Sequence, residues 1–401
     1  MTEKAEGPLA GLRVIEMGQL LAGPFCGQLL ADFGAEVIKV EPPGKGDPMR
    51  EWGREKSHGQ SLWWPVIARN KKSLTLDLRT DAGQDVLRDL ARNADIVLEN
   101  FRPGTMERWG LGYETLSALN PGLIMVRVSG FGQTGPYSGH AGFGAIGEAM
   151  GGLRHVVGSP DRPPSRVGIS IGDSLAATFA ALGAMMALHA RHRTGRGQVV
   201  DSAIYEAVLT MMESLITEYD NAGYIRERTG SILPNVAPSN VYPTADGSGI
   251  LIAANQDTVF GRLAEAMGRP DLAHDPRYAT HTARGEHQQE LDALIAEWTG
   301  DRRADEVLTL MNDNGIPAGR IYRAPEMLED AHFKAREAIV RVMHPQFGEL
   351  AMQNVAPRLS ETPGSVRHPG PELGAHTEDV LNRVLGYDTA RVAHLREAGV
   401  I

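Results

Sequence analysis

The 401-residue sequence contains little that would mark a disulfide-bonded, membrane or nucleic-acid-binding protein. Its one cysteine, Cys26, cannot form an intrachain disulfide, which fits a reducing compartment such as the cytoplasm. The formal net charge of −10 argues against nucleic acid or an anionic membrane as a partner. No apolar run reaches spanning length, and no apolar segment near Met1 suggests a signal peptide. We therefore expect a cytoplasmic protein without a membrane or nucleic-acid partner.

Two ligand signatures are also missing. The first turn reads Gly-Gln-Leu-Leu-Ala-Gly-Pro over residues 18–24, where a dinucleotide fingerprint would read Gly-x-Gly-x-x-Gly. A nicotinamide enzyme is therefore unsupported. His189 and His192 have helical spacing, but no third ligand is evident nearby, so we expect no metal site.

The N-terminal half alternates between strand-like and helical patterns. Apolar runs at 12–17, 37–41, 74–78, 95–99 and 123–128 read as strands, and residues 24–33, 80–93 and 110–119 read as helices between them. This alternation predicts a doubly wound, Rossmann-like α/β domain with parallel strands, in which ligands bind at the carboxyl ends of the strands. Cys26 falls in an apolar helical run, so a buried core thiol is favoured over a nucleophile.

The composition changes after residue 220. Residues 224–243 are rich in loop formers, a hairpin is expected over 241–253, and helical patterns follow at 259–267, 286–298 and 304–311. We expect residues 224–332 to form a smaller α+β domain inserted into the large domain. The large domain would comprise residues 1–220 and resume over residues 335–401 with strand-like alternation and two closing helices.

The segment 166–198 is the most informative part of the sequence. A strand-like run at 167–171 is followed by Gly172, Asp173 and Ser174, and then by a helix over 175–189. This helix is apolar on nearly every face, which predicts that it is buried. Asp173 would stand where free N–H groups and the helix dipole favour a carboxylate. It is either a helix cap, the usual role of Asp there, or a nucleophile shielded from water.

Two more motifs accompany Gly-Asp-Ser at 172–174. Residues 99–104 read Glu-Asn-Phe-Arg-Pro-Gly directly after a predicted strand, and residues 191–201 read R-x-R-T-G-R-G-Q-V-V-D. Together these motifs resemble the class III CoA-transferases, the formyl-CoA transferase and carnitine CoA-transferase group, over nearly the whole chain. The resemblance implies that Asp173 is the catalytic nucleophile, that coenzyme A is the co-substrate, and that two chains interlock as a homodimer.

The resemblance also implies a set of CoA contacts. Asn100 and Phe101 would contact the pantetheine arm, and Arg108 would meet CoA through its fixed charge. Lys71 and Lys72 could serve the 3′-phosphate, although a charge pair in a loop is more often only solvated. The full implied set is Leu21, Ala22, Pro42, Lys45, Leu76, Arg79, Asn100, Phe101, Arg102, Arg108, Phe143 and Gly144.

The loop at 138–144 distinguishes two related groups of enzymes. Acyl-CoA racemases of the same fold use a His that would fall at Phe143 and an Asp that would fall at Gly144, and both are absent. Many transferases carry a carboxylate at position 144, so Glu148 could take over part of that role. The stretch 147–155 resembles transferases that use succinyl-CoA and dicarboxylates. A second acceptor carboxylate needs a cationic partner, for which the sequence offers Arg50, His155, Arg162 and Arg166.

The sequence therefore predicts a CoA-transferase that moves CoA from an acyl-CoA donor, succinyl-CoA by resemblance, to a small organic acid. The acceptor would be a dicarboxylate such as citramalate, hydroxymethylglutarate or malate, and the reaction would pass through an aspartyl-CoA thioester. One alternative is an acyl-CoA racemase or isomerase of the same fold. Another is a non-catalytic CoA-binding protein, which would never become labelled at Asp173.

Overall fold

A computed structural model describes residues 7–57 and 59–401, which form two compact units. Unit 1 comprises the chain up to Leu153, Val167–Ile216 and His332–Ile401, and unit 2 comprises Arg154–Arg166 and Thr217–Ala331. The sequence placed the inserted domain at 224–332 and did not assign residues 154–166 to it. Those residues belong to unit 2 because they bond to its second segment, for example through Gly230 N–H to Gly158 O at 2.9 Å.

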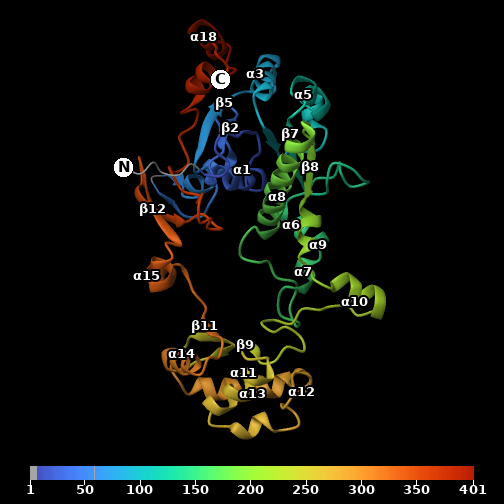
Figure 1. The fold of residues 1–401 in the computed structure, drawn as a ribbon, viewed down its shortest axis with the longest axis vertical. Coiled ribbons are helices and arrows are strands. Elements are labelled where there is room, and N and C mark those ends of the chain that lie inside the picture. The colour runs from blue at the N-terminus through green and yellow to red at the C-terminus, as the bar shows by residue number, and fades with distance from the viewer. Residues whose placement is uncertain (1–6, 58) are drawn as a thin grey trace. The chain divides into compact units, whose positions relative to one another are not determined.

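Unit 1 is built on six parallel strands in the order β5-β2-β1-β6-β7-β8 (Figure 1). The strands are β1 (Arg13–Glu16), β2 (Glu36–Glu41), β5 (Lys71–Thr75), β6 (Ile96–Glu99), β7 (Ile124–Ser129) and β8 (Val199–Ala203). The chain moves outward from β1 through β2 to β5, then returns to β6 on the other side and continues to β8. The predicted doubly wound α/β class is therefore confirmed, and the strand order reverses between β1 and β6.

Two details of the strand prediction were wrong. Residues 167–170 form no strand, because helix α8 (Ile171–Thr194) already begins at Ile171. The edge strand β8 was not predicted, because only two valines precede its polar Asp201 and Ser202. Pairing with the buried strand β7, rather than local pattern, determines this strand.

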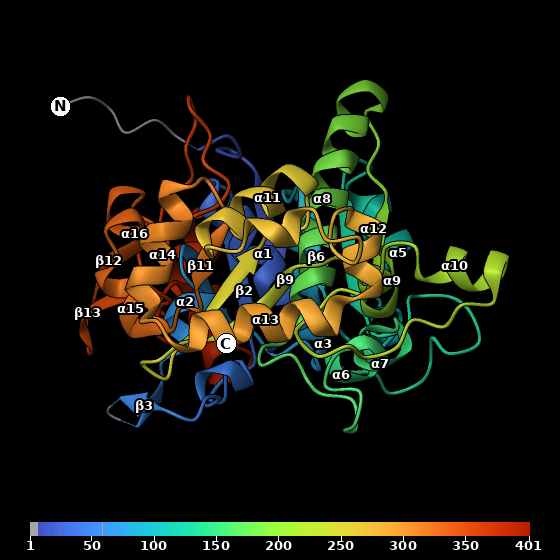
Figure 2. The same ribbon diagram turned by 90° about the horizontal axis from the view of Figure 1, so that it is seen from below.

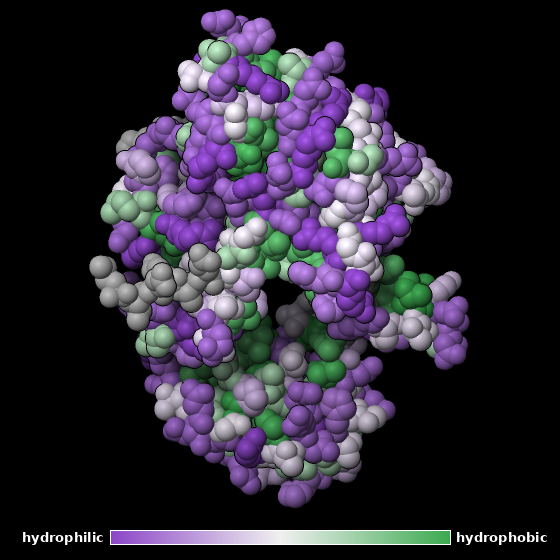
Figure 3. Space-filling model, turned by 45° about the horizontal axis from the view of Figure 1, so that its top comes forward, coloured by the Kyte–Doolittle hydropathy of each residue, from purple (hydrophilic) through white to green (hydrophobic). Residues whose placement is uncertain are grey.

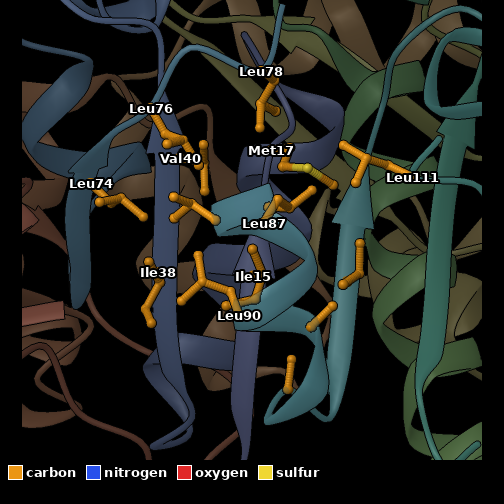
Figure 4. Packing of buried hydrophobic residues seen from close by; sticks show 14 of the residues in the cluster. Ile15, Met17, Ile38, Val40, Leu74, Leu76, Leu78, Leu87, Leu90 and Leu111 are labelled. Atoms are coloured by element: carbon orange, nitrogen blue, oxygen red, sulfur yellow. The ribbon is translucent and has the colours of Figure 1, made fainter. Parts of the chain in front are cut away.

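One face of the sheet is covered by α3 (Asp81–Arg92), α5 (Tyr113–Leu119), α17 (Thr377–Arg383) and α18 (Thr389–Glu397). Figure 4 shows Leu87 and Leu90 of α3 pointing toward Ile15 and Ile38 on the strands. All four side chains are fully buried. The two closing helices come from the end of the chain, so the C-terminal segment completes the core of this face.

The other face carries α1 (Ala22–Asp32) and α8, which pack along each other. α8 meets its neighbours through small side chains, since Ala176, Ala180 and Ala184 are fully buried. The predicted burial of this helix holds on one side only, because Leu182 is 48% exposed and Met186 is 61% exposed. By length and apolar composition α8 could span a membrane, but the core helix of a soluble protein passes the same test, and 44% of its most apolar window is buried here.

The topology brings the first turns of α1 and α8 to one edge of the sheet. α1 follows β1, so it starts at the carboxyl edge, and α8 precedes β8, so it ends at the amino edge. Both helices therefore run in the same direction, with their N-termini at the carboxyl edge. This is the edge at which open α/β sheets bind ligands.

Smaller elements complete the chain. In or bordering unit 1 these are η1 (Pro48–Arg50), β3 (Lys56–Ser57), β4 (Gln60–Ser61), α2 (Trp64–Ile67), α4 (Thr105–Arg108), α6 (Gly144–Met150), α7 (Leu153–Val156), α9 (Ile204–Thr210), α10 (Leu215–Ala222), α16 (Ala331–Ala335) and the hairpin of β12 (Ile339–His344) and β13 (Gly348–Gln353). Most of the surface visible in Figure 3 is hydrophilic, with smaller apolar areas between.

Unit 2 has the predicted α+β character, with an antiparallel sheet and several helices, drawn in yellow and orange in Figure 2. Its core includes Tyr242 and Ile252 from the sheet and Phe260 and Leu291 from the helices. Its elements are β9 (Ser239–Pro243), β10 (Gly249–Ala253), β11 (Ala318–Arg320), α11 (Asp257–Ala266), η2 (Pro270–Ala273), α12 (His281–Glu286), α13 (Gln288–Gly300), α14 (Ala304–Asp313) and α15 (Ala324–Glu329).

Candidate active site

Asp173 is the third residue of α8 and lies in its first turn. The sequence placed it just before the helix, but the helix begins four residues earlier than predicted, at Ile171, and its N-cap is Ser170. Its carboxylate rests against Gly144, the first residue of α6. A Cβ atom on Gly144 would collide with Oδ2 of Asp173 and would lie 2.8 Å from its Cγ atom. The absence of a side chain at position 144 therefore leaves the space in which the Asp173 carboxylate lies.

A second carboxylate lies at the start of the same helix. Glu148 of α6 is fully buried, and its Oε1 accepts the N–H of Gly172 at 3.3 Å. Gly172 must itself be small, because a Cβ there would come within 2.9 Å of the Glu148 Cγ. Glu148 therefore bonds to the backbone directly before Asp173 and fixes how α6 meets the first turn of α8.

A cavity of about 130 Å³ opens at the carboxyl ends of β5, β2, β1 and β6. Four of the predicted CoA contacts, Pro42, Leu76, Arg79 and Phe101, line it together. The position matches the point at which the strand order reverses, where doubly wound sheets bind nucleotides. The remaining lining residues are Met17, Gln19, Val40, Glu41, Asp77, Leu78 and Trp109.

The turn at residues 99–104 forms one wall of this cavity. Glu99 is buried, pairs with Arg127 at 2.7 Å and accepts the N–H of Phe101 at 2.6 Å. Burial raises the pKa of Glu99, although Arg127 opposes the rise. Gly104 has φ +82°, a conformation that favours glycine. The turn is therefore rigid, and the Phe101 ring packs edge-on against Trp109 with centroids 5.2 Å apart.

This combination of an aspartate at a helix start and a ligand cavity at the switch point agrees with the comparisons. Residues 9–377 match the family model of CoA-transferase family III. The chain belongs to this family. It is 65% identical over 400 residues to the succinyl-CoA–D-citramalate CoA-transferase of Chloroflexus aurantiacus, with 100% of both chains covered.

Other relatives of the transferase agree in sequence and in structure. The beta subunit of the succinyl-CoA–L-malate CoA-transferase of Chloroflexus aurantiacus is 41% identical over 397 residues, which cover 98% of each chain. The crystal structure of a CAIB/BAIF family protein from Brucella suis has a TM-score of 0.84 and 34% sequence identity, covering 94% of this chain and 100% of that one. The fold is therefore that of the CaiB/BaiF proteins.

Asn100, for which the resemblance implies a contact with CoA, bonds to the loop before α1. Its Oδ1 accepts the N–H of Gln19 at 2.7 Å, and its Nδ2 donates to the carbonyl oxygen of Gln19 at 2.9 Å. The side-chain amide of Asn100 thus bonds to both the N–H and the carbonyl oxygen of Gln19, in the loop before α1. An amide nitrogen has two N–H groups, so one remains to reach a ligand in the transferase.

Exposed cations follow the strands that end at the cavity. Lys45, Arg102 and Arg108 are exposed, and within residues 7–57 and 59–401 none of them pairs with a carboxylate. Arg108 bonds only to Thr105 Oγ1, at 2.9 Å. Arg79 differs, because it pairs with Asp77 at 2.7 Å. The transferase therefore has three exposed, unpaired cations available for phosphate groups.

The suggestion that Lys71 and Lys72 serve a phosphate is wrong for Lys71. Its ammonium is fully buried, 2.7 Å from Glu16 Oε2, and donates to the carbonyl oxygen of Pro24. Lys72 pairs with Glu36 at 2.8 Å. Both lysines lie at the amino end of β5 rather than in a loop. This end of the strand is at the edge of the sheet opposite the cavity.

The cations suggested for a second acceptor carboxylate belong to both units. Arg50 is already paired with Glu41 at 2.7 and 2.8 Å, which contradicts a free role for it. His155, Arg162 and Arg166 are exposed residues of unit 2, and His155 Nε2 lies 3.1 Å from Glu227. Asp173 and the cavity belong to unit 1.

The other predicted contacts and Cys26 are placed as follows. Leu21 is the N-cap of α1, Ala22 is its buried first residue, and Phe143 is the N-cap of α6 and 69% exposed. Burial, with Glu16 nearby, raises the pKa of Cys26, so this thiol stays protonated and is no nucleophile. In the described part of the chain no group of three or more His, Cys, Asp or Glu residues could hold a metal ion.

Proposed function

We propose that this enzyme transfers CoA from succinyl-CoA to a hydroxy-dicarboxylate, with citramalate as the first candidate and malate as the second. The observation that carries the proposal is Asp173 in the first turn of α8, at the same sheet edge as the cavity that contains Pro42, Leu76, Arg79 and Phe101. The names of the citramalate and malate relatives support the choice of donor and acceptor.

In the first half-reaction, Asp173 attacks the thioester carbonyl carbon of the donor. The C–S bond breaks and the CoA thiolate departs. The product on the enzyme is a mixed anhydride of succinate and Asp173. The thiolate then attacks the Asp173 carbonyl carbon, succinate leaves as its carboxylate, and CoA is held as a thioester on Asp173.

In the second half-reaction, the acceptor carboxylate attacks the Asp173 thioester. The CoA thiolate leaves and then attacks the acyl carbon of the new anhydride. The acceptor departs as its CoA ester, and the Asp173 carboxylate is regenerated. One thioester replaces another, so the protein needs mainly to exclude water from the anhydrides and to stabilise the oxyanions.

The first turn of α8 can supply that stabilisation. Its leading N–H groups have no partner within the helix, and the positive end of the helix dipole favours developing negative charge. Glu148 already takes the N–H of Gly172. The N–H of Ser174 already donates to the carbonyl oxygen of Ser170 at 3.1 Å, so the positive end of the helix dipole is the main contribution of this turn to stabilising the oxyanion.

The coenzyme would bind with its nucleotide end in the cavity at the strand ends. Leu76, Phe101 and Trp109 offer apolar surface there. Lys45, Arg102 and Arg108 would pair with its phosphates, for which the fixed charge and planar fork of arginine are well suited. Gln19 and Leu21 would then border the pantetheine arm on its way to Asp173.

The decisive experiment is intact-mass analysis after incubation with succinyl-CoA. We expect the wild-type protein to gain CoA as a thioester with loss of water, and Asp173→Ala to gain nothing. Ser174→Ala is the matched control in the same helical turn, and it should load normally. Citramalate should discharge the adduct and release its CoA ester.

Three outcomes would contradict this proposal. An adduct that persists in Asp173→Ala would place the nucleophile elsewhere. Absence of any adduct with succinyl-, acetyl- or formyl-CoA, together with entry of solvent deuterium at the α-carbon of an acyl-CoA, would indicate a racemase instead. CoA binding without either reaction would indicate a non-catalytic protein.

We also propose a homodimer and a cytoplasmic location. The exposed Leu182 and Met186 of α8, and the further exposed apolar residues Phe143, Ile146 and Met150, support a covering partner. The location is supported by the free, buried Cys26, which is compatible with a reducing compartment. Cell fractionation tests the location, and light scattering tests the oligomeric state.

A further inference from the structure

A cluster of four charged side chains lies buried beneath the loop that precedes α1. Lys39 Nζ is 2.7 Å from Asp47 Oδ2 and 3.2 Å from Glu16 Oε1, and Lys71 Nζ is 2.7 Å from Glu16 Oε2. None of the four side chains is more than 1% exposed. Both oxygens of Glu16 lie near a lysine, although neither contact has hydrogen-bond geometry.

Such a cluster is a costly way to fill a core. Removing a charge from water costs several kcal/mol, and apolar side chains of similar size are often at least as stabilising. Glu16 and Lys39 lie in strands predicted from the sequence, and the proposed mechanism uses none of the four. The contacts of the cluster therefore indicate a role beyond stability.

The cluster holds the backbone of residues 18–20. Lys39 Nζ donates to the carbonyl oxygen of Gly18, and Asp47 Oδ1 accepts the N–H of Leu20 at 3.1 Å. Asn100 fixes Gln19 between them. Three consecutive residues of the loop are therefore tied to side chains from other parts of unit 1.

The loop needs these ties because its conformation is unfavourable. Leu20 has φ 63°, in the left-handed region that is unfavourable for residues other than glycine. Gly18 and Gly23 touch, since a Cβ on either would lie 2.9 Å from the Cα atom of the other. The loop therefore doubles back sharply between the cavity, which Gln19 lines, and the first residue of α1.

Both members of the central pair are charged at neutral pH. Burial alone would raise the pKa of Asp47, but Lys39 and the N–H groups of Met49 and Leu20 hold it below its usual range. Burial alone would lower the pKa of Lys39, but the carboxylates of Asp47, Glu16 and Glu41 raise it above its ordinary value. The ties to the loop are therefore charge-assisted hydrogen bonds, which are stronger than neutral ones.

We propose that Asp47 and Lys39 are positioning residues for acyl transfer, which hold residues 18–20 so that the thioester is presented to Asp173 in a reactive geometry. The inference rests on the proposed function. It follows from the topology, because the loop lies between the cavity and α1, and α1 packs along α8 with its first turn at the same edge. Of residues 18–20, only Gln19 lines the cavity, and its other lining residues come from outside this loop. We therefore expect the pair to affect the rate of transfer rather than the affinity for CoA.

The test compares two buried carboxylates of unit 1. Asp47→Asn weakens the hold on the loop, whereas Asp32→Asn removes an equally buried charge, paired with Arg69 at 2.6 Å, that does not contact the loop. A third variant, Asp47→Asn with Lys39→Met, removes the pair as a unit and leaves no unpaired ammonium. Each is measured for melting temperature, KM for succinyl-CoA and the single-turnover rate of CoA loading.

We expect both single variants to melt earlier than the wild type, but only Asp47→Asn to load slowly. A misplacement of about 1 Å costs about a hundredfold in rate, and a loss of about tenfold to a hundredfold is expected here with KM unchanged. The double variant should regain melting temperature without regaining rate. If Asp32→Asn loads CoA at the wild-type rate, the unpaired buried charge of Arg69 does not by itself impair loading.

The proposal is overturned if the loading rate follows the melting temperature through all three variants, or if Asp47→Asn loads at the wild-type rate. It is also overturned if only KM changes. Failure of the wild-type protein to load CoA would instead contradict the proposed function, so the two failures are distinguishable. The double variant keeps the test available even if Asp47→Asn does not fold.

Discussion

The carboxylate of Asp173 lies in a space that exists only because residue 144 is glycine. A carboxylate at position 144, which the resemblance led us to look for, could not be accommodated without moving Asp173. Glu148 lies one helical turn further on and bonds to the backbone before Asp173. At the scale of single residues, the site is therefore defined by a missing side chain as much as by those present.

Gly144→Ala tests this arrangement. The new methyl group would displace the side chain of Asp173, which is only partly buried and can rotate away. We expect CoA loading to slow by about tenfold to a hundredfold because the nucleophile is misplaced, whereas the melting temperature should change little. Single-turnover mass analysis and thermal denaturation provide the two readouts.

The control for that variant is Gly139→Ala. Gly139 lies in the loop before α6, its φ is not in the left-handed region, and a Cβ there would have no neighbour within 4 Å. Its loading rate should equal that of the wild type. Equal rates for both variants would show that Asp173 does not depend on the space at position 144.

At the scale of elements, the C-terminal return contains two histidines that accept backbone hydrogen bonds, one from the sheet and one within the β12–β13 hairpin. His376 Nδ1 accepts the N–H of Ser73 at 3.2 Å, and His344 Nδ1 accepts the N–H of Gln346 at 3.2 Å. Burial lowers the pKa of both histidines, and His368 and Lys72 lower that of His376 further, against the opposing effect of Asp379. Protonation would replace each acceptor nitrogen by a donor.

The sign of the resulting pH dependence follows from these shifts. A histidine with a folded-state pKa below its unfolded value of about 6.5 contributes full stability above that value. The contribution is lost as the pH falls toward the folded-state pKa. We therefore expect the melting temperature of the wild type to fall as the pH is lowered from about 7.5 to about 5.5.

His376→Asn separates this residue from the other titrating groups. An asparagine oxygen can accept the Ser73 N–H in place of Nδ1 but does not titrate in this range. The variant should lose less melting temperature than the wild type over the same pH interval. An identical loss in both proteins would show that His376 does not contribute to the acid sensitivity.

At the scale of the whole molecule, the two units have separate cores, and unit 1 leaves an apolar strip of α8 exposed. Thr178, Leu182 and Met186 recur at intervals of four residues and are all exposed. A central helix with one uncovered apolar face indicates that something else covers it. The proposed homodimer would supply that cover from a second copy of the chain.

Met186→Lys tests whether α8 lies in such an interface. A buried, unpaired ammonium costs several kcal/mol, so the variant should populate monomer at concentrations where the wild type is dimeric. Light scattering after size-exclusion chromatography measures the change. Met343→Lys, which alters a methionine 69% exposed on β12, is the control. A monomeric wild type would refute the dimer, and a fully dimeric Met186→Lys would exclude α8 from the interface.

Local pattern was sufficient for the fold class and for placing Asp173 near a helix start, whereas its role as nucleophile was implied by the family resemblance. Apolar strand-like runs and helical patterns alternate along the chain, so a doubly wound sheet could be predicted. Gly-Asp-Ser at 172–174 indicated the start of a helix near Asp173, although that helix begins four residues earlier than predicted. The motif at 99–104 located Phe101 at a strand end because both features are adjacent in sequence. Each of these predictions depends on interactions between near neighbours in the chain.

Tertiary structure decided the properties that depend on partners distant in sequence. Three contacts illustrate this: Lys71 pairs with Glu16, Asn100 bonds to Gln19, and Asp47 is buried beside Lys39. In each contact the two residues lie on different segments of the chain. From sequence alone a charged residue is expected to be solvated, because its burial is unfavourable unless a partner of opposite charge offsets the desolvation. The sequence thus determined which residues are candidates for the chemistry, because motifs are local, and the packing of strands and helices decided which distant side chains contact them.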